Sequence, residues 1–136
     1  MGKKILIIDD SFLIRSGLEG AFKKSPNWDE VLLAENGQAG IEKILAEKPD
    51  IVLMDVEMPV MDGLTALKEI GTKKRSGEID KALPVVILSG TMYENDENVR
   101  KAKMLGAADV LAKPQGKSST ISVDIKELEG RLLKLL

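Results

Sequence analysis

The sequence contains no cysteine and no histidine among its 136 residues. Without cysteine, the chain cannot form disulfides, use a thiolate nucleophile or bind zinc through sulfur. Without histidine, it cannot carry a phosphohistidine, use a histidine base or build a Ser-His-Asp triad. If the chain takes part in phosphoryl transfer, the phosphoryl donor must therefore be another molecule.

Aromatic residues are scarce at 3%, whereas hydrophobic residues make up an ordinary 43%. The core must therefore be built from aliphatic side chains. A net charge of −2 argues against a nucleic-acid surface. No signal-peptide pattern is visible, and the apolar runs are far too short to span a bilayer. We expect residues 1–136 to form one soluble, cytoplasmic domain without membrane insertion or direct nucleic-acid binding.

Apolar strand-like segments alternate with helical segments along the whole sequence. Strands are expected at residues 3–8, 30–34, 51–55, 84–88 and 108–112, and helices at 12–24, 38–47, 64–70, 95–105 and 122–136. Residues 71–80 lack periodicity and predict a long, charged, mobile surface loop. Five tandem βα units imply a parallel sheet with helices on both faces.

Apolar spacing predicts the buried helix faces, and Trp28 is expected to serve in packing. The residues at core spacing are Leu13, Leu18 and Ala21, then Ile41, Ile44 and Leu45, then Ile125, Leu128, Leu132 and Leu135. Either Asp10 or Ser11 could cap the first helix.

Polar groups end or directly follow four of the expected strands. They are Asp9 with Asp10, then Asp55, Ser89 and Lys113. An adjacent acid pair alone more often caps a helix, but ligands of open parallel sheets bind outside the carboxyl ends of the strands. Three carboxylates gathered there would repel one another unless a cation lay between them. All-oxygen ligation suits Mg²⁺.

These groups suit phosphoryl transfer. Asp55 could attack phosphorus in line and form an acyl phosphate. Positioning and neutralisation of charge dominate such reactions. Mg²⁺ would supply two positive charges, the Lys113 ammonium a third, and the Ser89 hydroxyl a hydrogen bond to a phosphoryl oxygen.

The ordered set of motifs resembles the receiver domain of two-component response regulators over essentially the whole chain. The motifs are Asp9-Asp10, Asp55 followed by Met58-Pro59 and Met61-Asp62-Gly63, Ser89-Gly90 and Lys113-Pro114. The resemblance implies an α/β, flavodoxin-like, doubly wound sheet of five parallel strands in the order 2-1-3-4-5 with five helices. It also implies phosphorylation by a histidine kinase and a downstream protein target or effector domain.

The resemblance implies a role for each matching residue. Asp55 would be the phosphoacceptor and, with Asp10, a direct Mg²⁺ ligand. Asp9 would bind the metal through water, and Glu57 through its backbone carbonyl. Ser89 would be the switch hydroxyl and Lys113 the phosphoryl-binding lysine, with a cis Lys113-Pro114 bond.

A narrower similarity links the chain to the receivers of chemotaxis protein-glutamate methylesterases. It rests on the segments 55–59, 106–109, 113–114 and 121–125. A catalytic domain follows the receiver in those proteins, so this chain is expected to be either a freestanding domain or a fragment. Receivers commonly carry an aromatic residue where this chain has Val110, and we hypothesise that Tyr93 takes over part of its signalling role.

Two other functions remain open from the residues. Aspartyl-phosphate phosphohydrolases need an acid two residues after the nucleophile, and Glu57 stands there. No segment resembling their substrate-binding cap is visible. The third possibility is an interaction module that has lost phosphorylation, which the intact acid set and Lys113 oppose. We therefore expect a signalling domain that catalyses only its own phosphorylation and dephosphorylation.

Overall fold

The strands and helices alternate along the chain as expected. A computed structural model describes residues 2–89, 97–112 and 118–136, apart from the side chains of residues 118–124, and within these ranges the chain forms five strands and five helices. The strands are β1 (Lys3–Ile8), β2 (Trp28–Ala34), β3 (Ile51–Asp55), β4 (Val85–Ser89) and β5 (Asp109–Ala112). The helices are α1 (Phe12–Lys24), α2 (Gly37–Glu47), α3 (Gly63–Ser76), α4 (Glu97–Met104) and α5 (Ser118–Leu133).

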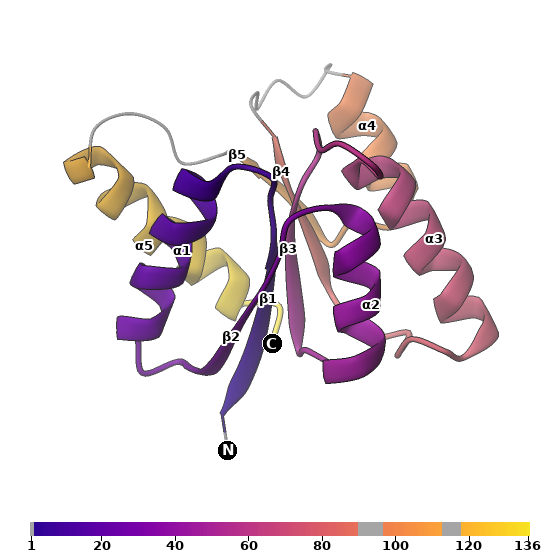
Figure 1. Cartoon of the computed structure of the whole chain (residues 1–136), viewed down its shortest axis with the longest axis horizontal. Helices are drawn as coiled ribbons and strands as arrows, with labels where there is room; N and C mark the ends of the chain where they lie inside the picture. Colours follow the sequence, from indigo (N-terminus) through magenta and orange to yellow (C-terminus); the bar gives the residue numbers. More distant parts are fainter. Residues whose placement is uncertain (1, 90–96, 113–117) are drawn as a thin grey trace.

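The strands form one parallel sheet in the order β2-β1-β3-β4-β5, which confirms the expected topology. All five run toward the upper edge of Figure 1. Their carboxyl ends are also level, since Asp55 is in register with Leu88, and Ser89 with Ala112. The residues that end the strands therefore meet at one edge.

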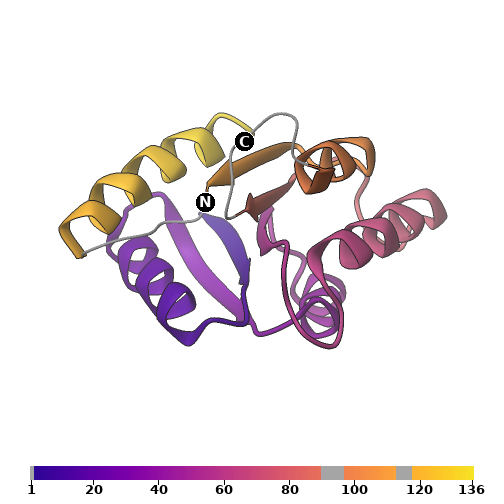
Figure 2. The same ribbon diagram turned by 90° about the horizontal axis from the view of Figure 1, so that it is seen from above.

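Helices cover both faces of the sheet. Figures 1 and 2 show α1 and α5 on one face and α2, α3 and α4 on the other. Each face has its own buried cluster, to which β1 contributes alternately: Ile5 and Ile7 pack with Phe22 of α1, while Leu6 and Ile8 pack with the α2–α3 side. Because both faces are covered, β1 is apolar along most of its length, as buried parallel strands are.

Two leucines that sequence spacing assigned to helix cores are exposed instead. Leu18 is buried in α1, but Leu13 is 81% exposed. Five residues at 3.6 per turn place Leu13 about 140° around the helix from Leu18, so it turns away from the sheet. In α2, Leu45 lies at the margin of the buried stripe and is 40% exposed.

The prediction of a mobile loop over residues 71–80 is wrong. Helix α3 continues to Ser76, and Ile79 beyond it is buried in the core. Gly77, with φ 87°, ends the helix, and its N–H bonds the carbonyls of Lys73 and Lys74. The cations of the last turn (Lys73, Lys74 and Arg75) also favour a helix carboxyl end. Their charge obscured the helix in the sequence.

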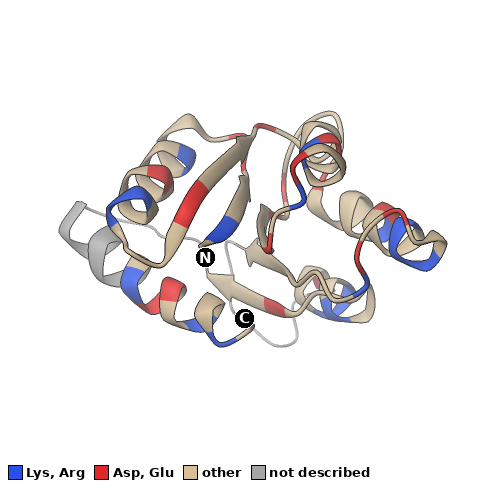
Figure 3. Cartoon of the chain, turned by 90° about the horizontal axis from the view of Figure 1, so that it is seen from below, with Lys and Arg blue, Asp and Glu red and all other residues tan. Residues whose placement is uncertain are grey.

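The end of the domain opposite the carboxyl ends of the strands carries basic and acidic positions side by side (Figure 3). Lys4 Nζ lies 3.9 Å from Glu30 Oε1, and Lys73 Nζ lies 3.8 Å from Glu78 Oε2. Lys74 donates to the Leu83 carbonyl, and burial lowers the pKa of its ammonium despite nearby Asp80. The Lys4–Glu30 pair joins β1 to β2, whereas the contacts of Lys73 and Lys74 tie the end of α3 to the following loop.

The carboxyl-terminal part of helix α5 is attached to both outer strands of the sheet, β2 and β5. Glu129 accepts a 2.6 Å hydrogen bond from the indole of Trp28 at the start of β2. Arg131 pairs with both carboxylate oxygens of Asp109 at the start of β5, at 2.8 and 3.1 Å. Leu132 is fully buried, whereas Leu135 lies beyond the helix end and is 36% exposed, so only part of the expected apolar face is core.

Trp28 lies in the packed interior, as expected, with its ring 5.8 Å from that of Phe22. It begins β2, whereas Ala34 ends that strand, so about 20 Å separates Trp28 from the edge that carries the acids. Added Mg²⁺ is therefore expected to change the intrinsic fluorescence of this single tryptophan only slightly. A titration of the protein with MgCl₂ checks this, and strong quenching would contradict the placement of the metal site.

Candidate functional site

The end of β1 fixes Asp9 inside the domain. Its N–H donates to the Ala34 carbonyl at 3.1 Å, and its Oδ1 accepts from the Ser11 N–H at 2.8 Å. The Ser11 hydroxyl accepts from the Ile14 N–H at 3.3 Å and so caps α1. Because Ser11 is the cap, capping does not account for the preceding acids. Asp9 is fully buried, whereas Asp10 is exposed.

The end of β3 fixes Asp55 beside it. Asp55 is 1% exposed, and its Oδ1 accepts from the Glu57 N–H at 3.3 Å. The next residue, Val56, continues the ladder by donating to the Leu88 carbonyl at 3.1 Å. A carboxylate is thus placed deep at the point where the chain leaves the sheet.

The three predicted carboxylates come together. Asp9, Asp10 and Asp55 each offer one oxygen, and these oxygens all lie within 4.8 Å of one another. Carboxylates at this separation repel one another unless a cation lies between them. Carboxylate oxygens are ligands for hard cations such as Mg²⁺. The donor set and its spacing therefore fit a hard divalent cation.

Ser89 lies at the same edge of the sheet. It ends β4 directly after Leu88, the register partner of Asp55, and is 3% exposed. In β5 its partner is Ala112, the residue before Lys113. Lys113, its bond to Pro114, and Tyr93 all lie outside the described residues. Val110 is buried in β5.

The β3–α3 loop is held by backbone contacts that sequence reasoning did not find. The Gly63 N–H donates to the Val56 carbonyl at 2.9 Å, and a Cβ at Gly63 would stand 2.3 Å from the Asp55 carbonyl oxygen. Met61 is fixed through its carbonyl, which accepts from the Gly37 N–H at 3.1 Å. The glycine after Met61-Asp62 was the available signal, since close backbone approach requires glycine.

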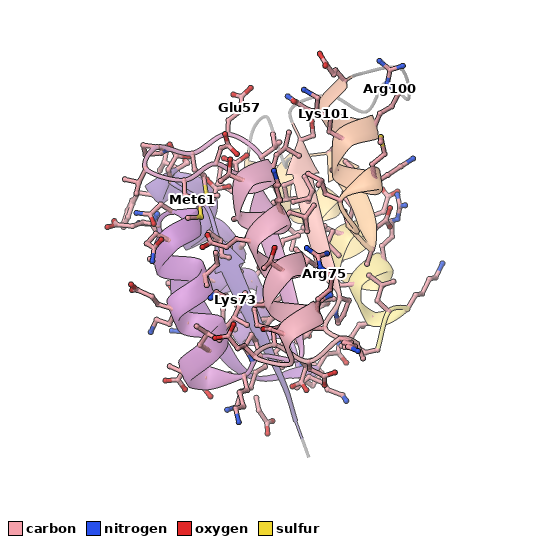
Figure 4. The ribbon with its side chains drawn as sticks, turned by 90° about the vertical axis from the view of Figure 1, so that its right-hand side faces the viewer. Glu57, Met61, Lys73, Arg75, Arg100 and Lys101 are labelled. Atoms are coloured by element: carbon pink, nitrogen blue, oxygen red, sulfur yellow. The ribbon has the colours of Figure 1, made fainter. Side chains whose placement is uncertain are left out.

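The same loop contains a backbone conformation unusual for a β-branched residue. Val60 has φ 66°, and the Met61 N–H bonds the Pro59 carbonyl at 2.7 Å across it, which is a γ-turn. Val60 is 83% exposed. Glu57 is also exposed and projects from the top of the domain, while Met61 lies near α2 (Figure 4). The loop therefore presents the backbone of Glu57, rather than its carboxylate, near Asp55.

Comparison with known protein families agrees with this geometry. The family model described as the response regulator receiver domain matches residues 5–123. This chain belongs to the response regulator receiver domain family. Among the described residues of this receiver domain, no helix is both long and apolar enough to cross a bilayer.

Similar curated proteins carry the name protein-glutamate methylesterase/protein-glutamine glutaminase. The receiver domain is 39% identical over 134 residues to protein-glutamate methylesterase/protein-glutamine glutaminase 1 of Syntrophomonas wolfei, an alignment that covers 98% of this chain and 35% of that protein. It is 37% identical over 130 residues to the corresponding protein of Geobacillus kaustophilus, covering 96% and 34%. The chain thus spans about a third of the length of these relatives.

Similar solved structures are receiver domains. The response regulator domain of Thermotoga maritima CheB superposes with a TM-score of 0.83 at 28% identity and covers 99% of this chain and 96% of that one. Chemotaxis protein CheY4 of Vibrio cholerae gives a TM-score of 0.81 at 25% identity, with both chains fully covered. The flavodoxin-like fold is thus shared with chemotaxis receivers.

Proposed function

We propose that this receiver domain is switched by phosphorylation of Asp55 in a Mg²⁺-dependent reaction. The observation that carries the proposal is the convergence of Asp9, Asp10 and Asp55, with Asp55 buried at the end of β3. Asp10 and Asp55 would bind the metal directly, Asp9 through water, and Glu57 through its carbonyl oxygen. When bound, Mg²⁺ neutralises charge on the acids and on the phosphoryl oxygens.

Asp55 is the nucleophile in this proposal. One carboxylate oxygen forms a bond to phosphorus while the bond from phosphorus to the donor breaks, and the donor leaves with that electron pair. The donor in the cell would be a phosphohistidine on a histidine kinase, since this chain contains no histidine. The Ser89 hydroxyl donates a hydrogen bond to a phosphoryl oxygen, and the Lys113 ammonium pairs with the phosphoryl charge.

The phosphoryl group then shifts the domain toward a partner-binding state. Ser89 moves toward the phosphoryl group, and the surface formed by α4, β5 and α5 changes shape as a result. The similarity to methylesterases supports a role in chemotaxis, with this receiver regulating an esterase effector domain or a separate protein target. Because Val110 stands where receivers commonly carry an aromatic residue, we propose that Tyr93 transmits part of the signal from Ser89 to this surface.

Mass spectrometry after incubation with acetyl phosphate tests the proposal. A switch is expected to gain one phosphoryl group, mapped to Asp55, that clears slowly with Mg²⁺ and does not form with EDTA. A phosphohydrolase would instead release phosphate continuously, although exposed Glu57 supports that chemistry poorly. A domain that gains nothing with Mg²⁺ would refute the proposed function.

A further inference from the structure

Arg15 reaches back from α1 to the backbone that carries the acids. Its Nη1 donates to the Asp9 carbonyl oxygen at 2.6 Å. The Arg15 N–H bonds the Ser11 carbonyl at 2.9 Å, so the backbone of Arg15 is fixed in the first turn of the helix. Helical side chains point toward the amino end, which brings the guanidinium over the end of β1. The contact therefore ties a rigid helix to the metal-binding segment.

Phe12 supports the guanidinium. The Arg15 Cζ lies 5.9 Å from the centre of the Phe12 ring, within the range of a cation–π contact. Phe12 is 70% exposed, so burial in the core does not account for the position of its ring. Aromatic ring, guanidinium and Asp9 carbonyl thus form a short chain of contacts that ends at the acid cluster.

The carbonyl that Arg15 holds belongs to the peptide bond between Asp9 and Asp10. Asp9 and Asp55 are both buried, so the surrounding core restrains their carboxylates. Asp10 is exposed and lacks that restraint. The direction in which the Asp10 side chain leaves the backbone therefore depends on the orientation of the preceding peptide. The guanidinium holds that peptide through its carbonyl oxygen.

We propose that Arg15 is a positioning residue for the metal site, which acts by orienting the Asp9–Asp10 peptide. The inference rests on the proposed function, because it assumes that the acids bind Mg²⁺. Loss of a group that orients a ligand typically weakens metal binding 10–100-fold. The charge of Arg15 has the opposite effect, since a cation beside the site repels Mg²⁺. The sign of the change in affinity therefore distinguishes positioning from simple electrostatics.

The test is a Mg²⁺ titration followed by the backbone amide NMR signals of residues 9–11. In Arg15→Ala, the dissociation constant for Mg²⁺ is expected to rise about tenfold. Phosphorylation by acetyl phosphate at sub-saturating Mg²⁺ should also slow in this variant, because a smaller fraction of the domain carries the metal. Lys24→Ala, which removes an exposed cation from the other end of α1, is the matched control and should bind Mg²⁺ like wild type.

Arg15→Gln provides a second variant that keeps much of the aliphatic stem and should also bind Mg²⁺ more weakly. Unchanged or tighter binding in either folded variant, with normal binding by wild type, would overturn the positioning role alone. A wild-type domain whose signals do not respond to Mg²⁺ would instead overturn the proposed metal site.

Discussion

The Asp55→Asn variant is expected to gain no phosphoryl group from acetyl phosphate under conditions in which the wild-type domain is fully modified. The carboxamide is nearly isosteric, so the packing at the end of β3 should persist, but it cannot form the acyl phosphate. Asp9 and Asp10 would still be engaged with the metal in the proposed site, so neither is expected to replace Asp55 as the phosphoacceptor. Intact-mass spectrometry with and without Mg²⁺ measures the effect.

Asp62→Asn is the matched control for that experiment. Asp62 lies in the loop that follows Asp55, is exposed, and caps α3 by accepting from the Thr65 N–H at 2.8 Å. Asparagine caps helices about as well as aspartate, so this variant should be phosphorylated normally. Equal modification of Asp55→Asn and wild type would show that the phosphoacceptor is a residue other than Asp55.

The Gly63→Ala variant is expected to lose about 1–3 kcal/mol of stability, or more, because its new methyl group meets backbone that cannot move aside. A Cβ at this position would stand 2.3 Å from the Asp55 carbonyl oxygen and 2.8 Å from the Val56 Cα. Relief of that contact would displace the start of the loop, so phosphorylation should slow as well. Urea unfolding measures the first effect, and acetyl phosphate labelling measures the second.

Gly20→Ala tests whether the effect belongs to the site. Gly20 lies inside α1 with open space where a Cβ would stand. Alanine there should stabilise the domain by about 0.5–1 kcal/mol, as it does in helix interiors. If Gly63→Ala were as stable as wild type and labelled at the same rate, the close packing of α3 against the end of β3 would not matter.

The architecture and the acid cluster could be predicted because both follow from short sequence patterns. Apolar segments ended by Asp9, Asp55 and Ser89 marked the strands, and parallel strands must bring such ends to one edge. The acids then met as expected. Strands buried on both faces are nearly continuous apolar runs, so the signal was strong where the site lies.

The contacts that hold the backbone of the site in place could not be predicted, because they form only in the folded protein. The hydrogen bond from Arg15 to the Asp9 carbonyl and the turn at Val60 leave no pattern in the sequence. The last turns of α3 were missed because charged residues replace apolar ones where the helix leaves the sheet. Gly77 marked that helix end, but only together with the basic residues before it.

The two attachments of α5 determine how that helix can respond to events at the opposite edge of the sheet. Glu129 holds it to β2 and Arg131 holds it to β5, within one turn of each other. Sliding the helix along its axis would break both contacts at once, whereas tilting about that turn would preserve them. The anchored turn is therefore a pivot, and displacement of the helix should increase toward its amino-terminal end.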